Sequence, residues 1–550
     1  MNKKRILSIF IVLLLLGAVV LFTRQPKSNA TVPPPVQLDL GLEEDSLEQM
    51  LDHTYSALDN VLKMNEDTAL NFQVQFRKGH VSKANLAGYL TKNDDGYSIN
   101  LKNSSPVTTP LVVDNTIYVS GGFGSKQFYS FDMTTGALNW AINLDDDGPS
   151  SPTYCDSLLI FNTESCTIFA VNRFTGKMVW SHWLGDPLLS SPLAVNGRVY
   201  TSYPDIRMYG GSIFNSYNNV QNNLLNNNPN IVQQQVPQPK PPKKPSSKQY
   251  TGKIKPRNPF VCFDAKDGSI LWQKWLDSDV MITPIYDDEF IYLTTYSGVV
   301  YKLDADKGDI VASVDLNATS LPSIVGNQIL ITKRSDSAKV VKESIAVLDK
   351  NTLALIKEFN AVDAPHLNAS IQNNSLSKME AERLDMYNGF SQGAPATANA
   401  QEASKNIGLS NVSSMQLFQP STVFYAAGKV YNLMGNTIYC SNPKTEEVVW
   451  QYTIEGDLEK VGGTLATTPI ITANNLITIT NKGKVLFLDL ITGQINFEKD
   501  LEKPVRSAPI ASDGKLIIPT TQGELVLLDT NDPTIDNWEM LMKQPNHQPN

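Results

Sequence analysis

Histidine and cysteine, the residue types that most often bind metals or act as nucleophiles, are few in this chain of 550 residues. None of the histidines has a partner at the spacing of a metal-binding pair such as H-x-x-x-H. His182, in the segment WSHWL, is expected on an outer strand, either hydrogen-bonded or exposed. The sequence therefore predicts no metal site. The five histidines are His53, His80, His182, His366 and His547.

The four cysteines form neither a C-x-x-C pair nor a C-x-x-C-H haem site. One interpretation is that they form one or two disulfides, because an exported chain can do so. The other is that all four are small apolar core residues on strands. Cys262 in FVCFD and Cys440 in IYCSN occupy the same position in two distant repeats, which favours the core interpretation. The remaining two are Cys155 and Cys166.

Other catalytic and phosphate-binding motifs are also missing from the sequence. It contains no G-x-S-x-G, no P-loop and no G-x-G-x-x-G followed by a helix. The segment GGFG at Gly121–Gly124 is predicted to be a β-turn. We therefore predict no catalytic residue, no cofactor-binding residue and no cofactor.

The elements that would position any site come from a repeat. Each unit begins with a proline after small polar residues and carries an Asp or Asn after an alternating apolar run. Eight of each are present, so the two doubled spacings are insertions within eight units. A period of this length, built of short strands, is typical of propeller blades. The prolines are Pro110, Pro152, Pro192, Pro284, Pro322, Pro420, Pro469 and Pro509, and the Asp/Asn positions are Asp132, Asn172, Asp264, Asp304, Asp349, Asn442, Asp489 and Asp529, at spacings of 40, 92, 40, 45, 93, 47 and 40 residues.

Each unit is predicted to hold four antiparallel strands. In the unit after Pro284 these are 285–288, 290–295, 299–305 and 309–316. Apolar residues recur there at every second position, and Gly and Asp mark the turns. A helix is excluded because the apolar residues do not recur at three- and four-residue spacing.

Three positions recur around the turn that precedes the fourth strand. The Asp or Asn side chain is expected to accept hydrogen bonds from turn amides, the Gly to adopt positive φ, and the Trp to cover the gap to the next blade. An enzyme site would occur once, so we predict that these residues are structural. They are Asp132, Gly136 and Trp140; Asn172, Gly176 and Trp180; Asp264, Gly268 and Trp272; and, without the Trp, Asp304 and Gly308, and Asp489 and Gly493.

The segments FYSFDMTTGALNW, IFAVNRFTGKMVW and VLFLDLITGQINF resemble the PQQ-like β-propeller repeat, over roughly Tyr97 to Asn531. The resemblance implies an all-β, eight-bladed propeller of four-stranded blades. The family includes quinone-dependent alcohol dehydrogenases and a non-catalytic periplasmic scaffold of outer-membrane barrel assembly. The dehydrogenases carry adjacent cysteines, a calcium site of Glu, Asn and Asp, and a catalytic Asp. This sequence has no adjacent cysteines, and none of its carboxylates matches the calcium motif, so the scaffold is favoured.

The ends of the repeat region suggest how the ring closes. The last unit lacks a full outer strand, whereas DDGYSINLKNSSP, before the first unit, resembles the end of a unit. We therefore expect Tyr97–Leu101 to pair as the outer strand of the last blade, which leaves few free edges.

The predicted organisation starts with a signal peptide or membrane anchor in residues 1–30, where Ile6–Thr23 carries no charge. Both alternatives place the rest of the chain outside the cytoplasm, in the periplasm or tethered to the inner membrane. Residues 31–96 are expected to be a linker with a short helix at Leu42–Met64. The propeller is expected at 97–532 and a C-terminal tail at 533–550.

Two insertions interrupt the propeller. Residues 203–259 are rich in Asn and Gln and then in Pro and Lys, a composition typical of disorder. Residues 361–416 are expected to be partly helical. Both insertions are expected on one face of the ring. A basic cluster in the first is either an arm that contacts an anionic partner or part of a solvated spacer; it comprises Lys240, Lys243, Lys244 and Lys248.

The net charge of −9, with a pI near 5.2, argues against a nucleic-acid partner. We therefore predict a monomeric, exported, non-catalytic propeller scaffold. Its protein partners are expected on the face that carries the insertions, and it contacts a membrane through the N-terminal segment if that segment is not cleaved. The alternatives are a quinone-dependent alcohol or sugar dehydrogenase or a degenerate relative of one, and a propeller that binds glycan or cell wall.

Overall fold

The fold was analysed in a computed structural model of the chain. The predicted N-terminal segment 6–23, the predicted helix Leu42–Met64 and the lysine cluster lie outside the described residues. Within the described residues, no helix is long and apolar enough to cross a membrane. The structure describes residues 75–77, 79–103, 105–163, 167–185, 188–204, 258–337, 340–368, 403, 405–408, 415, 418–458, 464–536, 538 and 540–541.

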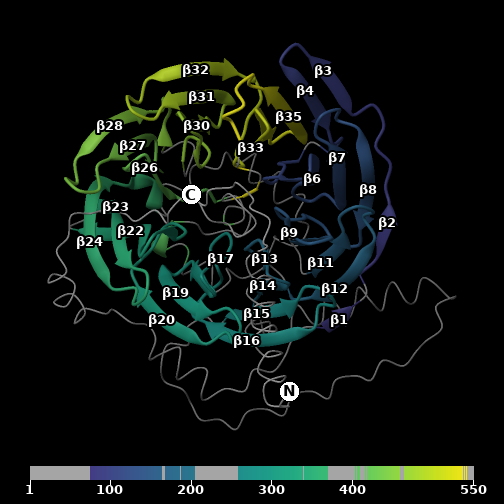
Figure 1. Cartoon of the computed structure of the whole chain (residues 1–550), viewed down its shortest axis with the longest axis horizontal. Coiled ribbons are helices and arrows are strands. Elements are labelled where there is room, and N and C mark those ends of the chain that lie inside the picture. The colour runs from purple at the N-terminus through teal and green to yellow at the C-terminus, as the bar shows by residue number, and fades with distance from the viewer. Residues whose placement is uncertain are drawn as a thin grey trace, which may run out of the picture. The chain divides into compact units, whose positions relative to one another are not determined.

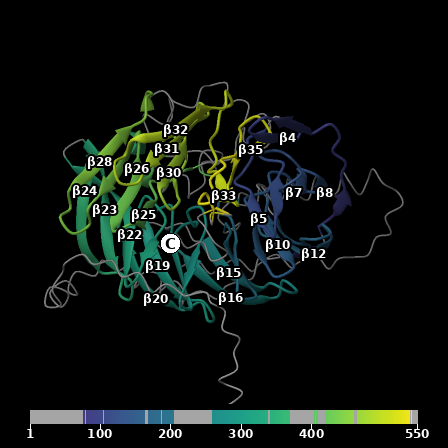
Figure 2. The ribbon, with the colours of Figure 1, turned by 45° about the horizontal axis from the view of Figure 1, so that its top comes forward.

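Eight antiparallel sheets stand side by side around a central axis (Figures 1 and 2). The first strand of each chain repeat lies nearest the axis and the fourth lies at the periphery, as the positions of β13 and β16 in Figure 1 show. The predicted all-β, eight-bladed propeller is confirmed. We call the sheets blades 1 to 8 in the order of their innermost strands.

The strands of the first four blades follow the predicted repeat closely, and in the unit after Pro284 each boundary is within one residue of expectation. From the innermost strand outward, blade 1 contains β5 (Leu111–Val113), β6 (Thr116–Ser120), β7 (Gln127–Asp132) and β8 (Leu138–Leu144); blade 2 contains β9 (Thr153–Cys155), β10 (Leu158–Asn162), β11 (Thr167–Asn172) and β12 (Met178–Trp183); blade 3 contains β13 (Leu193–Val195), β14 (Arg198–Ser202), β15 (Asn258–Asp264) and β16 (Ile270–Leu276); and blade 4 contains β17 (Ile285–Asp287), β18 (Phe290–Thr294), β19 (Val299–Asp304) and β20 (Ile310–Asp315).

The remaining blades repeat the same up-and-down order. Blade 5 contains β21 (Ser323–Val325), β22 (Gln328–Ser337), β23 (Val340–Asp349) and β24 (Leu355–Asp363); blade 6 contains β25 (Val423–Ala426), β26 (Lys429–Met434), β27 (Thr437–Ser441) and β28 (Val448–Thr453); blade 7 contains β29 (Ile470–Ile471), β30 (Asn475–Ile479), β31 (Lys484–Asp489) and β32 (Ile495–Asp500); and blade 8 contains β33 (Ile510–Ser512), β34 (Lys515–Pro519), β35 (Glu524–Asp529) and β4 (Gly96–Asn100).

The hydrophobic core is divided among the gaps between neighbouring blades. Side chains on a strand alternate between its two faces, so each central strand contributes to two gaps. On β10, for example, Ile160 packs toward blade 3, whereas Leu159 and Phe161 pack toward blade 1. This explains why the second and third strands are apolar at nearly every position and buried on both faces.

Blade 8 is completed by a strand that precedes the first blade in the sequence. β4 pairs antiparallel with β35, with Leu525 opposite Ile99 and Leu527 opposite Tyr97. The Tyr97 hydroxyl donates a hydrogen bond to the Met133 carbonyl of blade 1. The ring of Tyr97 also lies where a β-carbon on Gly136 would stand. Tyr97 therefore contacts the next blade as the repeat tryptophans do.

Three short strands within residues 75–93, a region predicted to be linker, extend the outer edges of blades. β1 (Gln75–Arg77) pairs with β12, β2 (Val81–Lys83) with β8, and β3 (Leu90–Asn93) with β4. An outermost strand presents free backbone N–H and C=O groups, which an additional strand can pair. Blades 1, 2 and 8 consequently have five strands.

The ends of the second insertion are also more ordered than predicted. β24 continues to Asp363 because Lys342 of β23 lies opposite it, and a 3-10 helix, η3 (Pro365–Leu367), follows. Arg334 Nη1 donates hydrogen bonds to the carbonyls of Leu367 (2.9 Å) and Asn406 (3.1 Å). Both ends of the insertion are thus attached to blade 5, while the predicted helix between them lies outside the described residues.

Candidate functional site

The repeat residues lie in the turns between the third and outermost strands. The Asp132 carboxylate accepts hydrogen bonds from the Thr135 backbone N–H and hydroxyl, both at 2.7 Å, and the hydroxyl contributes most to lowering the pKa of Asp132. Corresponding turn bonds are made by Asn172, Asp264, Asp304 and Asp489. The glycines Gly136, Gly176, Gly268, Gly308 and Gly493 all have φ between 67° and 73°.

The repeat tryptophans connect each blade to the next. The Trp180 indole N–H donates to the Ala265 carbonyl of blade 3 at 2.8 Å. A β-carbon on Gly268 would lie 2.7 Å from the same indole, so the glycine also permits this close approach. Trp140 and Trp272 donate in the same way to Arg173 and Ala305. These residues are distributed around the periphery and form no common site.

The described cysteines and His182 are buried within the fold. Cys155, Cys262 and Cys440 are free thiols, and burial raises the pKa of Cys262 to about 12 and that of Cys440 to about 11. Such thiols are poorly reactive because the thiolate is the nucleophile. His182 Nε2 lies 2.6 Å from the Gly268 carbonyl, and burial lowers the pKa of the imidazole. These side chains belong to the core.

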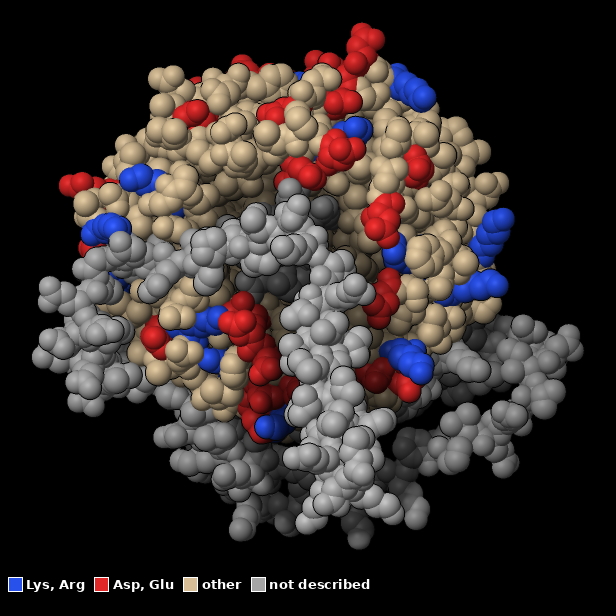
Figure 3. All heavy atoms as spheres, in the orientation of Figure 1, with Lys and Arg blue, Asp and Glu red and all other residues tan. Residues whose placement is uncertain are grey.

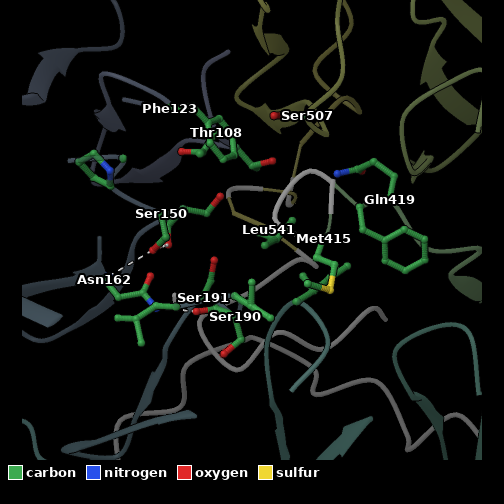
Figure 4. Close-up of a pocket in the computed structure, with 18 residues that line it drawn as sticks. Thr108, Phe123, Ser150, Asn162, Ser190, Ser191, Met415, Gln419, Ser507 and Leu541 are labelled. Atoms are coloured by element: carbon green, nitrogen blue, oxygen red, sulfur yellow. Dashed lines mark hydrogen bonds between the residues drawn. The ribbon is translucent and has the colours of Figure 1, made fainter. Parts of the chain in front are cut away.

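A cavity of about 70 Å³ lies near the axis, where connections from the outermost strand of one blade to the innermost strand of the next converge (Figure 4). Its lining includes the small polar residues that precede the repeat prolines. The motif is thus visible in the sequence, where it predicts only the boundary of a repeat unit. The polar side chains that line the cavity are Thr108, Thr109, Ser150, Ser151, Asn162, Ser190, Ser191, Gln419 and Ser507.

Several of these side chains tie neighbouring loops together. The Ser507 hydroxyl donates to the Val107 carbonyl at 2.7 Å, and Thr109 donates to Ala508 at 3.0 Å, so both bonds join blade 8 to blade 1. Asn162 Nδ2 donates to the Ser190 carbonyl at 2.6 Å. The lining is therefore largely engaged in holding the loops in place.

A buried carboxyl group, Asp279, lies behind the wall of the cavity. The Ser190 and Ser202 hydroxyls are 3.0 Å apart, and Ser202 donates to Asp279 Oδ1, which also accepts the Val280 N–H at 2.8 Å. Asp279 is fully buried, and this burial raises its pKa to about 7. No motif or spacing in the sequence marks Asp279 as a buried group beside the cavity.

The lining of the cavity does not fit the calcium and quinone chemistry of the related dehydrogenases. Calcium requires six to eight oxygen ligands and usually several carboxylates. The described residues that line the cavity have hydroxyl, amide and apolar side chains, and none of them is Asp, Glu, Lys, Arg or His. Within the described part of the chain, no cluster of three His, Cys, Asp or Glu side chains could hold a metal. We therefore derive no redox step at this site.

The surface carries charge of both signs. Figure 3 shows acidic and basic side chains interspersed over the visible face. Many are paired, such as Arg198 with Asp306 and Lys350 with Asp288, each at 2.9 Å. The acidic partner in each of these pairs is exposed, and ion pairs at a protein surface contribute little stability.

The family model described as outer membrane protein assembly factor BamB matches residues 126–213, 241–370 and 410–547. The chain belongs to this family. The predicted PQQ-like propeller resemblance is confirmed, because the same propeller repeats carry the match.

Curated relatives match only short stretches of this family member. A tetrathionate hydrolase of Acidithiobacillus ferrooxidans is 33% identical over 97 residues, covering 16% of this chain and 19% of its own. The quinoprotein alcohol dehydrogenase PedH of Pseudomonas putida is 29% identical over 110 residues, which cover 17% of this chain and 18% of PedH. The chain thus matches less than a fifth of the length of either relative.

Solved structures similar to this BamB-family chain include both kinds of family member. BamB from Moraxella catarrhalis is 12% identical, with a TM-score of 0.42 over 82% of this chain and 97% of its own. Quinohemoprotein alcohol dehydrogenase from Comamonas testosteroni is 14% identical, with a TM-score of 0.46 over 80% of this chain and 77% of the dehydrogenase chain.

Proposed function

We propose that this chain is a non-catalytic propeller scaffold of the cell envelope that binds protein partners, and that it serves the assembly of outer-membrane proteins. The observation that carries the proposal is that the described residues lining the axial cavity are uncharged, where a dehydrogenase would need carboxylates. Membership of a family described by a BamB assembly factor supports it.

We place the partner surface on one face of the ring, called here the insertion face. In an up-and-down blade, the connection between the second and third strands and the connection to the next blade leave at the same end. The first insertion joins β14 to β15 and the second joins β24 to β25, so both belong to this face. An anionic partner would suit Lys240, Lys243, Lys244 and Lys248 of the first insertion.

The proposal includes the organisation predicted from the sequence. Residues 1–30 direct the chain out of the cytoplasm, as a signal peptide or as an anchor, and the propeller acts as a monomer. The pairing of β4 with β35 supports a ring closed by both ends of the repeat region. A closed ring is a rigid platform, which suits a scaffold.

A dye-reduction assay separates the scaffold from a dehydrogenase. The purified chain is incubated with pyrroloquinoline quinone and Ca²⁺, then with primary alcohols or sugars and a redox dye, beside a quinoprotein dehydrogenase as positive control. We expect no substrate-dependent dye reduction. Reduction that requires quinone, calcium and substrate together would contradict the scaffold function.

A further inference from the structure

The C-terminal segment, which the sequence suggested to be a tail, lies against the innermost strand of blade 8. The Ala511 N–H donates to the Trp538 carbonyl at 2.8 Å, and the Trp538 N–H donates back to the Ala511 carbonyl at 2.9 Å. The Gly514 N–H donates to the Ile535 carbonyl at 2.9 Å. The segment therefore pairs with the axial edge of β33 as an added antiparallel strand would.

The side chains of this segment are anchored on several blades. Trp538 is 4% exposed and meets the ring of Phe424, on blade 6, edge-on at 5.5 Å. Ile535 is fully buried in the same cluster, which lies between blades 7 and 8. Met540, 1% exposed, packs with residues of blades 1 and 2, and Leu541 contacts the cluster of blades 4 and 5. A segment that contacts so many blades must lie at their common axis.

The segment runs through the channel from one face to the other. Ile535 is bonded to Gly514, at the turn between β33 and β34, on the face opposite the insertions. Leu541 lines the cavity together with Ser507, which precedes β33 on the insertion face, as Figure 4 shows. The described part of the segment therefore leads toward the insertion face and ends there at Leu541.

We propose that the central channel is a binding site for an extended peptide and that the C-terminal segment, through Ile535, Trp538, Met540 and Leu541, is its resident ligand. Backbone pairing to a free strand edge, with side chains filling alternate pockets, is an established mode of peptide recognition. The anchors are a tryptophan in a closely packed site, typical of an interface hot spot, and the apolar Met540 and Leu541 beyond it. The described residues that line the cavity beside Leu541 are uncharged, which favours an apolar or hydroxylated residue over a charged one.

This inference names a second kind of partner segment for the proposed scaffold and in that sense rests on the proposed function. A partner peptide with the same spacing of anchors would have to displace the resident segment. A ligand attached to its own site acts at an effective concentration of about a millimolar, so the intact chain should bind such peptides weakly. The channel would be opened by a competitor or by loss of the C-terminus.

The test uses the full chain with a protease site inserted between the exposed Asn531 and the half-buried Asp532. After folding, half of the sample is cut and its freed C-terminal peptide is washed away. A fluorescein-labelled peptide of residues 533–541 is then titrated, and its anisotropy is measured. We expect the cut protein to bind at least tenfold more tightly than the uncut protein. A peptide with Trp538→Ala should bind at least tenfold more weakly than the native sequence.

Equal binding before and after cutting, or no binding to cut protein that remains folded by circular dichroism, would overturn the proposal. If the cut protein unfolds, the uncut W538A chain replaces it. That chain should bind the native peptide at least tenfold more tightly than the wild type does, while the surface variant I491A should bind as the wild type does. Equal binding by both variants would overturn the proposal. The peptide is this chain's own, so failure here leaves the scaffold test untouched.

Discussion

At the level of single residues, the repeat signature is a device for joining blades. The Asp or Asn fixes the turn, the Gly allows the next blade to approach, and the Trp donates a hydrogen bond across the gap. These roles could be predicted from the sequence because each is local and occurs many times. A buried group that occurs once, such as Asp279, leaves no such pattern and needs the folded chain to be found.

The contribution of one tryptophan hydrogen bond can be measured directly. Trp180→Phe keeps most of the ring packing but leaves the Ala265 carbonyl without its 2.8 Å donor. We expect the free energy of unfolding to fall by about 1–3 kcal/mol. The neighbouring Val179 is 47% exposed, so Val179→Ala should change it by less than about 0.5 kcal/mol. Urea denaturation of both variants tests this expectation, and equal losses would contradict it.

The buried Asp279 predicts a pH dependence of stability. Its folded-state pKa of about 7 lies above the unfolded value, so the folded state holds the proton more tightly. The stabilisation from Asp279 is complete below about pH 4 and is lost as the pH rises to about 7, at up to about 1.4 kcal/mol per unit.

Asp279→Asn should reduce this dependence, because an amide oxygen can still accept from Ser202 and Val280 and the side chain no longer ionises. Thermal midpoints at pH 5 and pH 8 should therefore differ less in the variant than in the wild type. The turn variant Asp132→Asn, at a half-buried position, is the control and should keep the wild-type difference. If the midpoints at pH 5 and pH 8 differ as much in Asp279→Asn as in the wild type, groups other than Asp279 control the pH dependence of stability.

At the level of elements, strands with clear alternation were predictable and very short strands were not. The strands of the unit after Pro284 lie within one residue of expectation. β1 and β2 are three residues each, QFR and VSK, and are too short to show a period. They form because the outer edges of blades 2 and 1 supply backbone partners, which sequence periodicity cannot reveal. The pairing of Ala511 with Trp538 was missed for the same reason.

The proposed role of β4 in closing the ring can be separated from that of the strands before it. A chain that starts at Gly96 keeps β4 and the Tyr97 contact to blade 1, whereas a chain that starts at Lys102 lacks both. Both chains lack β1, β2 and β3. We expect the first to unfold cooperatively and the second to lose its cooperative transition and become sensitive to protease. Closely similar thermal unfolding curves would contradict closure by β4.

At the level of the whole molecule, the family and the propeller were predictable, because the repeat extends over most of the chain. The proposed partner surface was less accessible from the sequence. The insertions are visible as doubled spacings, but their attachment depends on single contacts such as Asn406 Nδ2 to the Ala318 carbonyl at 2.6 Å. Likewise, the axial cavity depends on loops from separate blades meeting around one axis.

The central claim, a scaffold that binds proteins through its insertion face, is tested most directly by site-specific photo-crosslinking in cells. A crosslinking amino acid replaces the exposed Asp145 or Glu502, both in connections on the insertion face, or the exposed Lys266 or Asn351, both in turns on the opposite face. Adducts are then identified by mass spectrometry. The scaffold account predicts one dominant protein adduct from the insertion-face positions and little from the turn positions. Adducts that form only from the turn positions, or none from any of the four, would contradict it.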